Sequence, residues 1–143
     1  MGEARAVMDR MTDAMFADDF DTVASLYAEE AVVETPDMGE LHGRERIVEY
    51  LKGFTDAFPD ARYELISGRE AGNVAVDEGY FVGTNSGPLP GPAGETLPAT
   101  GRSMRLRTCD IATVEEGVIV SHRFYYDQMD FMSQLGLLPE EPA

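Results

Sequence analysis

The sequence predicts an α+β fold in which helices come first and an antiparallel sheet follows. In the first third of the chain, apolar residues recur with the three-to-four-residue spacing of amphipathic helices. In the remainder they alternate with polar residues, and turn residues separate the alternating segments. Helices grouped before strands are typical of α+β proteins, in which the helices pack on an antiparallel sheet.

Length and composition predict one folded domain over residues 1–143. Of the 143 residues, 43% are hydrophobic and 27% are charged, as in ordinary globular domains. The formal net charge is −16. So acidic a surface repels nucleic-acid phosphates and anionic lipids, and we expect neither nucleic acid nor membranes among the partners.

The N-terminus predicts a cytoplasmic protein, because charges stand where a signal peptide needs an apolar run. No window approaches the roughly 18 apolar residues that a membrane span requires. Cys109 is the only cysteine of the chain, so an internal disulfide is excluded. Since no Cys/His cluster is visible either, we expect no metal and no cofactor.

Helical spacing predicts helices over Glu3–Ala17, Phe20–Ala28 and Arg44–Ala57. Between the second and third helices, Ala31–Glu34 is predicted as a short strand, because the proline that follows cannot donate to a strand ladder. We interpret Asp37–Gly43 as a turn-rich link. The third helix should end at Phe58-Pro-Asp60, since proline cannot continue a helix.

Four longer strands are predicted over Ala61–Glu70, Val74–Asn85, Arg102–Val114 and Val118–Tyr126. The first two form a hairpin around Ala71-Gly-Asn73. Ser86–Ala99 is rich in proline and glycine, so it is predicted as a long loop. A loop of this length after a strand of the pocket wall is expected to act as a lid.

The last two strands carry the most informative pattern. A three-residue turn, Glu115–Gly117, would pair Asp110 with His122 and Thr108 with Phe124. By the period of two, these residues then share one face with Met104, Leu106, Ala112, Val114, Val118 and Val120. A two-residue turn would shift the pairing by one residue and separate Asp110 from His122.

Two interpretations of the Asp110–His122 pair remain open. A carboxylate beside an imidazole fixes the orientation of the ring and forms a proton-transfer unit. The same pair would also serve as a structural ion pair that merely satisfies two buried polar side chains.

Other polar residues are assigned simpler roles. Asp127 precedes a last short helix and is predicted as its N-cap. Arg105, Arg107, Arg123 and Tyr125 lie on the face opposite to the pair. Because arginine and aromatic residues are enriched at interfaces, we expect this face to form a homodimer contact.

Several motifs in order resemble the SnoaL-like polyketide cyclases and ester cyclases of the nuclear-transport-factor-like superfamily. They are Ala57-Phe-Pro-Asp60, Gly83-Thr-Asn-Ser-Gly87, Pro98-Ala-Thr-Gly-Arg102, Val114-Glu-Glu-Gly-Val-Ile119, His122-Arg123, Asp127 and Gln134-Leu-Gly136. The resemblance spans almost the whole chain. It implies a cone-shaped fold with a deep apolar pocket between the helices and the concave face of the sheet.

The chain departs from its relatives at positions that carry chemistry. Cyclases of this type place a catalytic aspartate where this chain has Phe124. The more distant ketosteroid isomerases would have a tyrosine at Met11 and an aspartate at Thr35, and only their oxyanion-hole aspartate is retained, as Asp110. Limonene epoxide hydrolases would have an arginine at Thr108.

The resemblance and the pair together predict a cofactor-independent cyclase or isomerase that moves a proton on an apolar polyketide-like or terpenoid small molecule. The catalytic residues would be Asp110 and His122. The expected substrate-binding residues are Met11, Glu34, Thr35, Tyr80, Asn85, Met104, Thr108, Phe124 and Tyr126. Two alternatives stay open: a non-catalytic binding protein, and an epoxide hydrolase or epoxide-opening cyclase that uses Asp110 with Glu34.

Overall fold

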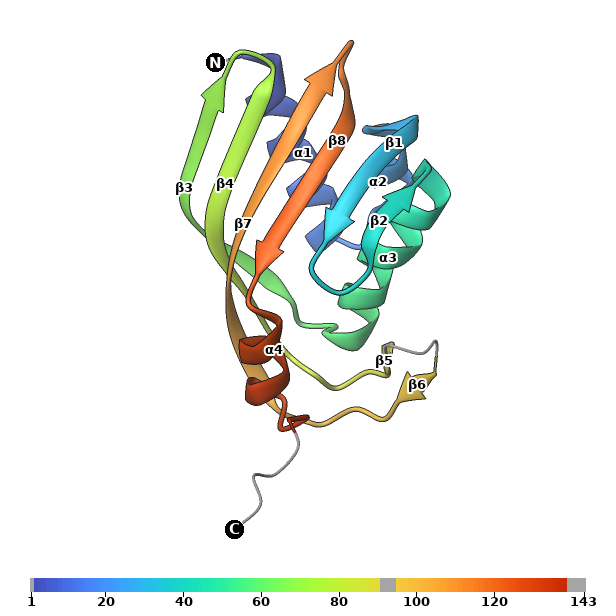
Figure 1. Cartoon of the computed structure of the whole chain (residues 1–143), viewed down its shortest axis with the longest axis vertical. Coiled ribbons are helices and arrows are strands. Elements are labelled where there is room, and N and C mark those ends of the chain that lie inside the picture. The colour runs from blue at the N-terminus through green and yellow to red at the C-terminus, as the bar shows by residue number, and fades with distance from the viewer. Residues whose placement is uncertain (1, 91–94, 139–143) are drawn as a thin grey trace.

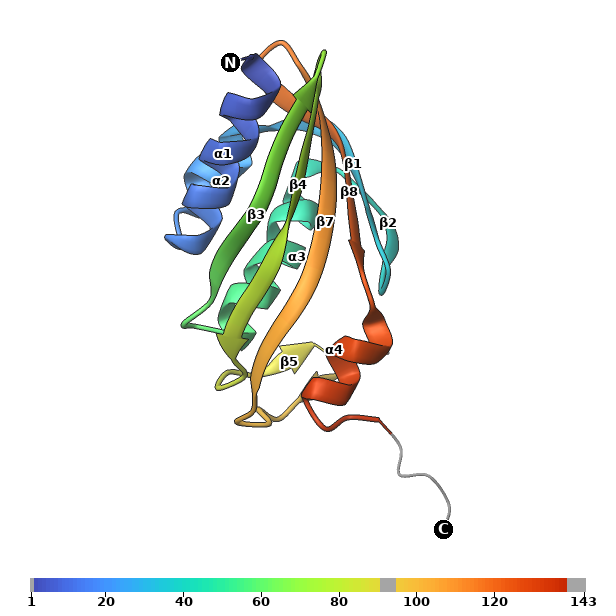
Figure 2. The same cartoon turned by 90° about the vertical axis from the view of Figure 1, so that its left-hand side faces the viewer.

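Six strands form one curved sheet, and helices pack against one of its faces (Figures 1 and 2). The structure is a computed structural model and describes residues 2–90 and 95–138. The strand order is β2 (Gly39–His42), β1 (Tyr27–Thr35), β8 (Val118–Tyr126), β7 (Ser103–Glu115), β4 (Val74–Thr84) and β3 (Arg62–Ala71). Strands β1 and β8 run parallel, and the other neighbours run antiparallel. The predicted α+β class is confirmed.

The helices largely follow the prediction. They are α1 (Glu3–Phe16), α2 (Phe20–Ser25), α3 (Arg44–Ala57) and α4 (Gln128–Gln134). The second helix was expected to continue to Ala28 and is shorter, because Tyr27 already pairs with Ile119 of the sheet. The N-cap role of Asp127 is confirmed, since its carboxylate accepts from the backbone N–H groups of Met129 and Asp130.

Most strands lie close to their predicted positions. Only β1 is much longer than predicted, whereas β3 and β7 are shifted by one residue, β4 is one residue shorter and β8 matches its predicted bounds. The segment predicted as a turn-rich link contains β2. The link interpretation is wrong because Gly39–His42 pairs with β1 as an edge strand.

The segment predicted as one long loop, Ser86–Ala99, contains regular structure on both sides of residues 91–94. Two short strands, β5 (Leu89–Pro90) and β6 (Thr96–Leu97), pair in a sheet of their own. Residues 91–94, which belong to the predicted lid, lie outside the described residues. Within residues 2–90 and 95–138, no helix is long and apolar enough to cross a membrane.

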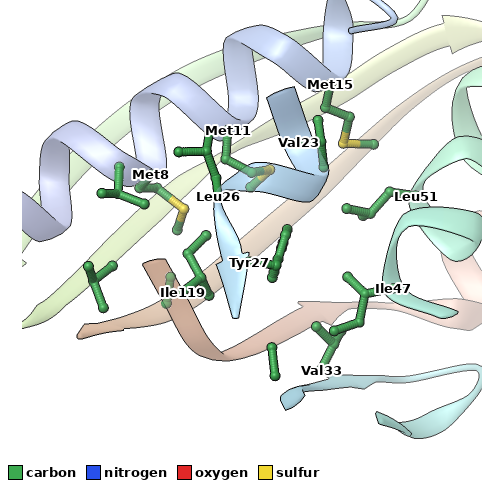
Figure 3. Close-up of a cluster of buried hydrophobic side chains, with 14 of the residues drawn as sticks. Met8, Met11, Met15, Val23, Leu26, Tyr27, Val33, Ile47, Leu51 and Ile119 are labelled. Carbon is green, nitrogen blue, oxygen red and sulfur yellow. The ribbon is translucent and has the colours of Figure 1, made fainter. Parts of the chain in front are cut away.

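Two hydrophobic clusters form the core. The larger cluster fills the space between α1, α2, α3 and the sheet, and Figure 3 shows Met8, Met11 and Leu51 pointing into it. The smaller cluster lies towards α4 and includes Phe58, Phe81, Leu106, Phe131 and Leu135, with the remaining members Ala57, Leu89 and Met104. Burial of these side chains is the main stabilising contribution to the fold.

The register of the β7–β8 hairpin differs from the predicted one. Its turn has two residues, Glu116 and Gly117, both at positive φ (51° and 80°), the conformation of a type I′ turn. Such a turn alone would send Asp110 and His122 to opposite faces. A β-bulge at Val120 inserts one extra residue into β8 and restores the shared face.

The pairs that result are Asp110 with Phe124, Ala112 with His122 and Thr108 with Tyr126. The predicted direct pairing of Asp110 with His122 is therefore wrong, and the two are diagonal neighbours on one face. Ile119, rather than Val118 or Val120, takes the buried position opposite Val114.

Candidate active site

A cavity of about 80 Å³ lies where the two hydrophobic clusters meet. We call it the inner cavity. Its walls come from α1, α3 and the helix-facing side of β3, β4, β7 and β8. It is lined by Met11, Thr12, Met15, Phe16, Tyr50, Leu51, Phe54, Tyr63, Asp77, Phe81, Leu106, Thr108, Asp110, Phe124 and Tyr126. Most of this wall is apolar, so its few polar groups act in a medium of low dielectric constant.

The predicted Asp110–His122 contact is present. Nε2 of His122 lies 2.6 Å from Oδ2 of Asp110, and the imidazole is fully buried. Asp110 lines the inner cavity, whereas His122 lies behind it and does not reach the cavity wall. The ring of Phe124 covers the imidazole, with 4.1 Å between the ring centroids. Only the carboxylate of the pair is therefore in a position to touch a ligand.

Tyr27 determines which protons His122 carries. Its hydroxyl lies 2.7 Å from Nδ1 of His122, which is its only hydrogen-bond partner among the described residues. Burial and the charge of Asp110 raise the pKa of Tyr27 well above its ordinary value, so the hydroxyl keeps its proton. A buried hydroxyl proton needs an acceptor. Nδ1 is thus the unprotonated nitrogen, and Nε2–H donates to the carboxylate of Asp110.

A second carboxyl group, Asp77 of β4, lines the same cavity. Asp77 and Asp110 are direct partners in the β4–β7 register and face the same side of the sheet. Burial, and then the negative charge of Asp110, raise the pKa of Asp77, and Arg5 opposes this shift. Two facing carboxyl groups in different surroundings can divide the roles of acid and base.

Arg5 of α1 supplies the positive charge beside Asp77. One guanidinium nitrogen lies 2.6 Å from Oδ1 of Asp77, as an ion pair without the alignment of a hydrogen bond. The same guanidinium donates two hydrogen bonds to Asp9. Gly68 makes this approach possible, since a Cβ atom there would lie 2.9 Å from the guanidinium.

Asp77 was missed by the sequence reasoning, although a signal existed. In Val74–Thr84 the buried residues alternate, and Asp77 falls between Ala75 and Phe81 on the inward face. The same period of two that drew attention to Asp110 therefore applies to Asp77.

Four of the predicted substrate-binding residues, Met11, Thr108, Phe124 and Tyr126, line the inner cavity. Glu34 and Thr35 do not. They line a separate rim groove of about 720 Å³, together with Pro36, Gly39, Glu40, Glu78, Arg107, Cys109, Tyr125, Asp127 and Asp130, and it shares Thr108, Phe124 and Tyr126 with the cavity. The expectation that Glu34 is the second acid beside Asp110 is wrong, because β1 carries it to the exposed rim.

Three other predicted residues also lie away from the inner cavity. Asn85 is fully buried and holds the loop ends together, donating to Ala57 and Gly87 and accepting from Thr100. Tyr80 lies on the opposite face of the sheet, where the guanidinium of Arg105 stacks 3.6 Å from its ring centroid. Met104 is buried in the smaller hydrophobic cluster.

Tyrosine hydroxyls provide the remaining polar atoms of the cavity. Tyr63 accepts a hydrogen bond from the hydroxyl of Thr108 at 3.3 Å, so its own proton is free for another partner. Tyr50 donates to Asp37 at 2.9 Å and lies 3.4 Å from the hydroxyl of Tyr126. Burial raises the pKa of all three tyrosines, which keeps them neutral hydrogen-bond donors.

Beyond Tyr50 and Tyr126 lies a third cavity of about 420 Å³, which we call the outer pocket. It is formed by α3, α4, β5, β6 and neighbouring loops. Its lining consists of Asp37, Met38, Tyr50, Gly53, Phe54, Leu89, Pro90, Leu97, Tyr126, Gln128, Met129, Phe131, Met132, Leu137 and Leu138. Part of the predicted lid, Leu89, Pro90 and Leu97, thus borders the outer pocket rather than the inner cavity.

The sequence profile of the SnoaL-like domain family matches residues 8–122. The chain belongs to the SnoaL-like domain family. The matched range runs from α1 to His122 and therefore includes both members of the Asp110–His122 pair. No curated protein sequence matches the chain.

Solved structures share the fold of this SnoaL-like domain. One is a candidate SnoaL-like polyketide cyclase from Jannaschia sp. CCS1 (TM-score 0.83, 15% identity), with 96% of this chain and 94% of that chain covered. IdmH, a candidate polyketide cyclase from Streptomyces antibioticus, has a TM-score of 0.78 at 22% identity, covering 94% and 99%. AclR, a candidate hydroxylase from Streptomyces galilaeus, has a TM-score of 0.79 at 21% identity, covering 98% and 89%. At such identities the likeness concerns the fold alone.

Phe124 gives the inner cavity an apolar wall beside Asp110. It is the direct strand partner of Asp110, at the position where the family resemblance leads one to expect an aspartate. An acid there would face Asp110 across the two strands. The apolar ring instead covers His122. The polar groups in the wall of the inner cavity are therefore Asp77, Asp110 and the hydroxyl groups of its threonines and tyrosines.

Proposed function

We propose that this SnoaL-like domain is a cofactor-independent cyclase or isomerase that transfers a proton on an uncharged, carbonyl-bearing small molecule. The observation that carries the proposal is the carboxylate of Asp110, which lines an apolar cavity and is held from behind by the Nε2–H of His122. Family membership supports the same class of activity.

Asp110 acts as the base. Its carboxylate accepts a proton from a carbon next to a carbonyl group, and the electron pair of the broken C–H bond moves to the carbonyl oxygen. The Tyr63 hydroxyl, which accepts from Thr108 and stays protonated, donates to that oxygen. His122 is a positioning residue, since it orients Asp110 without reaching the cavity.

The enolate then reacts in one of two ways. In an isomerisation, Asp110 returns the proton to another carbon and the double bond moves. In a ring closure, the enolate carbon bonds to a second carbonyl carbon of the same molecule, whose oxygen takes the proton back from Asp110. Either way the carboxylate is regenerated. The apolar wall strengthens these steps by excluding water from the charged oxygen.

Proton exchange into 1-tetralone, an uncharged bicyclic ketone, tests the proposal. Wild-type protein in D₂O should accelerate deuterium incorporation next to the carbonyl, measured by ¹H NMR. Asp110→Asn keeps an oxygen that accepts from His122, so the fold should survive while the rate falls by roughly 10²–10⁴-fold. Asp13→Asn, an exposed change on α1, is the matched control.

Two outcomes contradict the proposal. The first is full exchange activity in Asp110→Asn. The second is binding of 1-tetralone by wild-type protein without exchange above the buffer rate, which is the result expected of the non-catalytic binding protein.

The facing carboxyl groups support epoxide opening as a second candidate function. Asp110 would take a proton from water while the water oxygen bonds to an epoxide carbon. As the carbon–oxygen bond breaks, protonated Asp77 would give its proton to the leaving oxygen. Hydrolysis of styrene oxide that is lost in Asp77→Asn, in a variant that keeps ketone exchange, would favour this candidate. No hydrolysis by wild-type protein would remove it.

A further inference from the structure

We propose that the outer pocket is a second binding subsite, which holds an apolar tail of an uncharged substrate whose polar end reaches Asp110. This inference rests on the proposed function in one respect, namely that the reacting end of the ligand lies at Asp110. It adds the chemical class of the rest of the substrate and the residues that select it.

The outer pocket adjoins the inner cavity. Both are lined by Tyr50, Phe54 and Tyr126, which form the wall between them. Tyr126 pairs with Thr108, two residues along the strands from the pair of Asp110 and Phe124. Two residues of strand span about 7 Å. A ligand that contacts Asp110 and enters the outer pocket must therefore be elongated.

The wall between the two spaces is closed by a short chain of hydrogen bonds. The hydroxyl proton of Tyr50 goes to Asp37 at 2.9 Å, so in the 3.4 Å contact between the two tyrosines Tyr126 is the donor. This last contact is long, and a ligand oxygen between the hydroxyls would accept from Tyr126 instead. Ligand binding between Tyr50 and Tyr126 would thus replace one weak hydrogen bond within the protein by one to the ligand.

The walls of the outer pocket select an apolar, uncharged group. Leucines, methionines, a proline and phenylalanines dominate them, and Asp37 is the only charged side chain among the described lining residues. Met38 and Met129 are 51% and 64% exposed. Methionine side chains are flexible and adapt to ligands of different shape. An anionic tail would be repelled by Asp37 and by the net charge of −16.

The volumes of the two spaces agree with this division. Pockets for small molecules usually enclose roughly 300–1,000 Å³. The inner cavity, at about 80 Å³, takes only the reacting end of such a molecule, whereas the outer pocket, at about 420 Å³, has room for the remainder.

A series of 4-alkylphenols tests the inference with the purified protein. The phenol hydroxyl is a donor for Asp110, and the alkyl chain lengthens from methyl to hexyl towards the outer pocket. Isothermal titration calorimetry should show affinity rising by about three- to fourfold for each methylene that enters the pocket. Alkylbenzenes of the same length, which lack the hydroxyl, should bind more weakly.

Gly53→Leu fills the outer pocket from α3. A Cβ atom at Gly53 meets only the ring of Pro90, at an ordinary 3.5 Å, and leucine is a better helix former than glycine. The variant should bind 4-methylphenol within about twofold of wild type and lose at least tenfold for 4-hexylphenol, the gain from two methylenes. Lys52→Leu, on the exposed side of the same helix, should bind the whole series as wild type does.

A flat series in wild-type protein, or equal weakening of every ligand in Gly53→Leu, would overturn the inference. Failure of the proposed function gives a different result. If affinity rises with chain length but Asp110→Asn leaves 4-hexylphenol binding unchanged, the outer subsite stands and the role of Asp110 falls. If loss of the phenol hydroxyl weakens binding but chain length has no effect on affinity, the role of Asp110 stands and the outer subsite falls.

Discussion

One hydroxyl proton, that of Tyr27, determines the charge of the candidate catalytic pair. Because Tyr27 donates to Nδ1, His122 is neutral and Asp110 carries the negative charge. A charged imidazole would need both of its N–H groups to find acceptors and would leave the tyrosine proton without one. The carboxylate is therefore poised as a base rather than neutralised by a salt bridge.

Nitrogen NMR of the two histidines checks this arrangement. At neutral pH we expect His122 to show a protonated Nε2 and an unprotonated Nδ1, and Tyr27→Phe should alter the Nδ1 signal most. His42 is exposed and gives an internal reference. Protonation of both ring nitrogens of His122 would contradict the neutral assignment.

The raised pKa of Asp77 makes its contribution to the stability of the fold decrease as pH rises. Burial and Asp110 raise its pKa in the folded state above the ordinary value of 3.8. At pH values between 3.8 and the raised pKa, the folded state binds more protons than the unfolded state. The contribution of Asp77 to stability is therefore lost as pH rises through this range. Asp77→Asn removes the effect.

The stability of Asp77→Asn relative to wild type should therefore increase as pH rises above about 4. Urea unfolding at a series of pH values measures it, and Asp13→Asn corrects for the loss of one negative charge. A relative stability that falls with rising pH would show that Arg5 outweighs burial at this site.

Sequence periodicity found one acid of the cavity and missed the other. Asp110 stood out because the predicted hairpin placed a histidine opposite it, whereas no such partner was predicted for Asp77. Tyr80 and Asn85 were misplaced for a different reason. Their surroundings depend on Arg105 and on the ends of a loop, contacts that no local pattern encodes.

In the β7–β8 hairpin, two deviations from the predicted structure cancel. The sequence favoured a three-residue turn because Gly117 suits its left-handed position, and such a turn keeps Asp110 and His122 on one face. The chain uses a two-residue turn and a bulge at Val120, and the shared face is the same. A bulge leaves no clear sequence signal, so the register could not be predicted. The predicted face is nevertheless correct, because the shorter turn and the bulge compensate each other.

Glu116 adopts positive φ in this turn, where residues other than glycine, asparagine and aspartate are strained. Glu116→Asn gives the Asn-Gly pair that type I′ turns prefer. We expect the free energy of unfolding to rise by about 1 kcal/mol and Tm by about 3 °C in thermal unfolding.

Glu115→Asn is the control for Glu116→Asn, because Glu115 belongs to the strand and pairs with Val118. It removes the same charge without relieving a left-handed residue and should not stabilise the protein. Equal stabilisation by both variants would mean that charge, rather than backbone conformation, is responsible.

The fold could be predicted from the sequence, whereas the cavity could be predicted only in part. Helices, strands and their order follow from spacing and turn residues, and Arg44–Ala57 and Val118–Tyr126 match their predicted bounds. The division into an inner cavity and an outer pocket could not be predicted, because Tyr50 and Tyr126 meet only after α3 has packed near the end of β8.

The outer face of the sheet is the predicted homodimer contact. Tyr125 is half exposed there, and Arg105 is stacked on Tyr80. Light scattering at micromolar concentration should give twice the chain mass of 15.7 kDa, and Tyr125→Glu should reduce it to one chain. A monomer mass for wild-type protein would remove the dimer. Salt should strengthen association by screening the repulsion between two acidic chains.

If Asp110 and His122 act as one unit in proton transfer, the effects of replacing them should not add, and 1-tetralone exchange rates of the single and double variants measure this. Asp110→Asn and His122→Gln should each slow exchange by roughly 10²–10⁴-fold. The double variant should be little slower than either single variant, because the positioning residue has no role without the base. His122→Gln should also change the pH profile of exchange, which a purely structural loss would not. Losses that multiply in the double variant, or full activity in both single variants, would contradict the central claim.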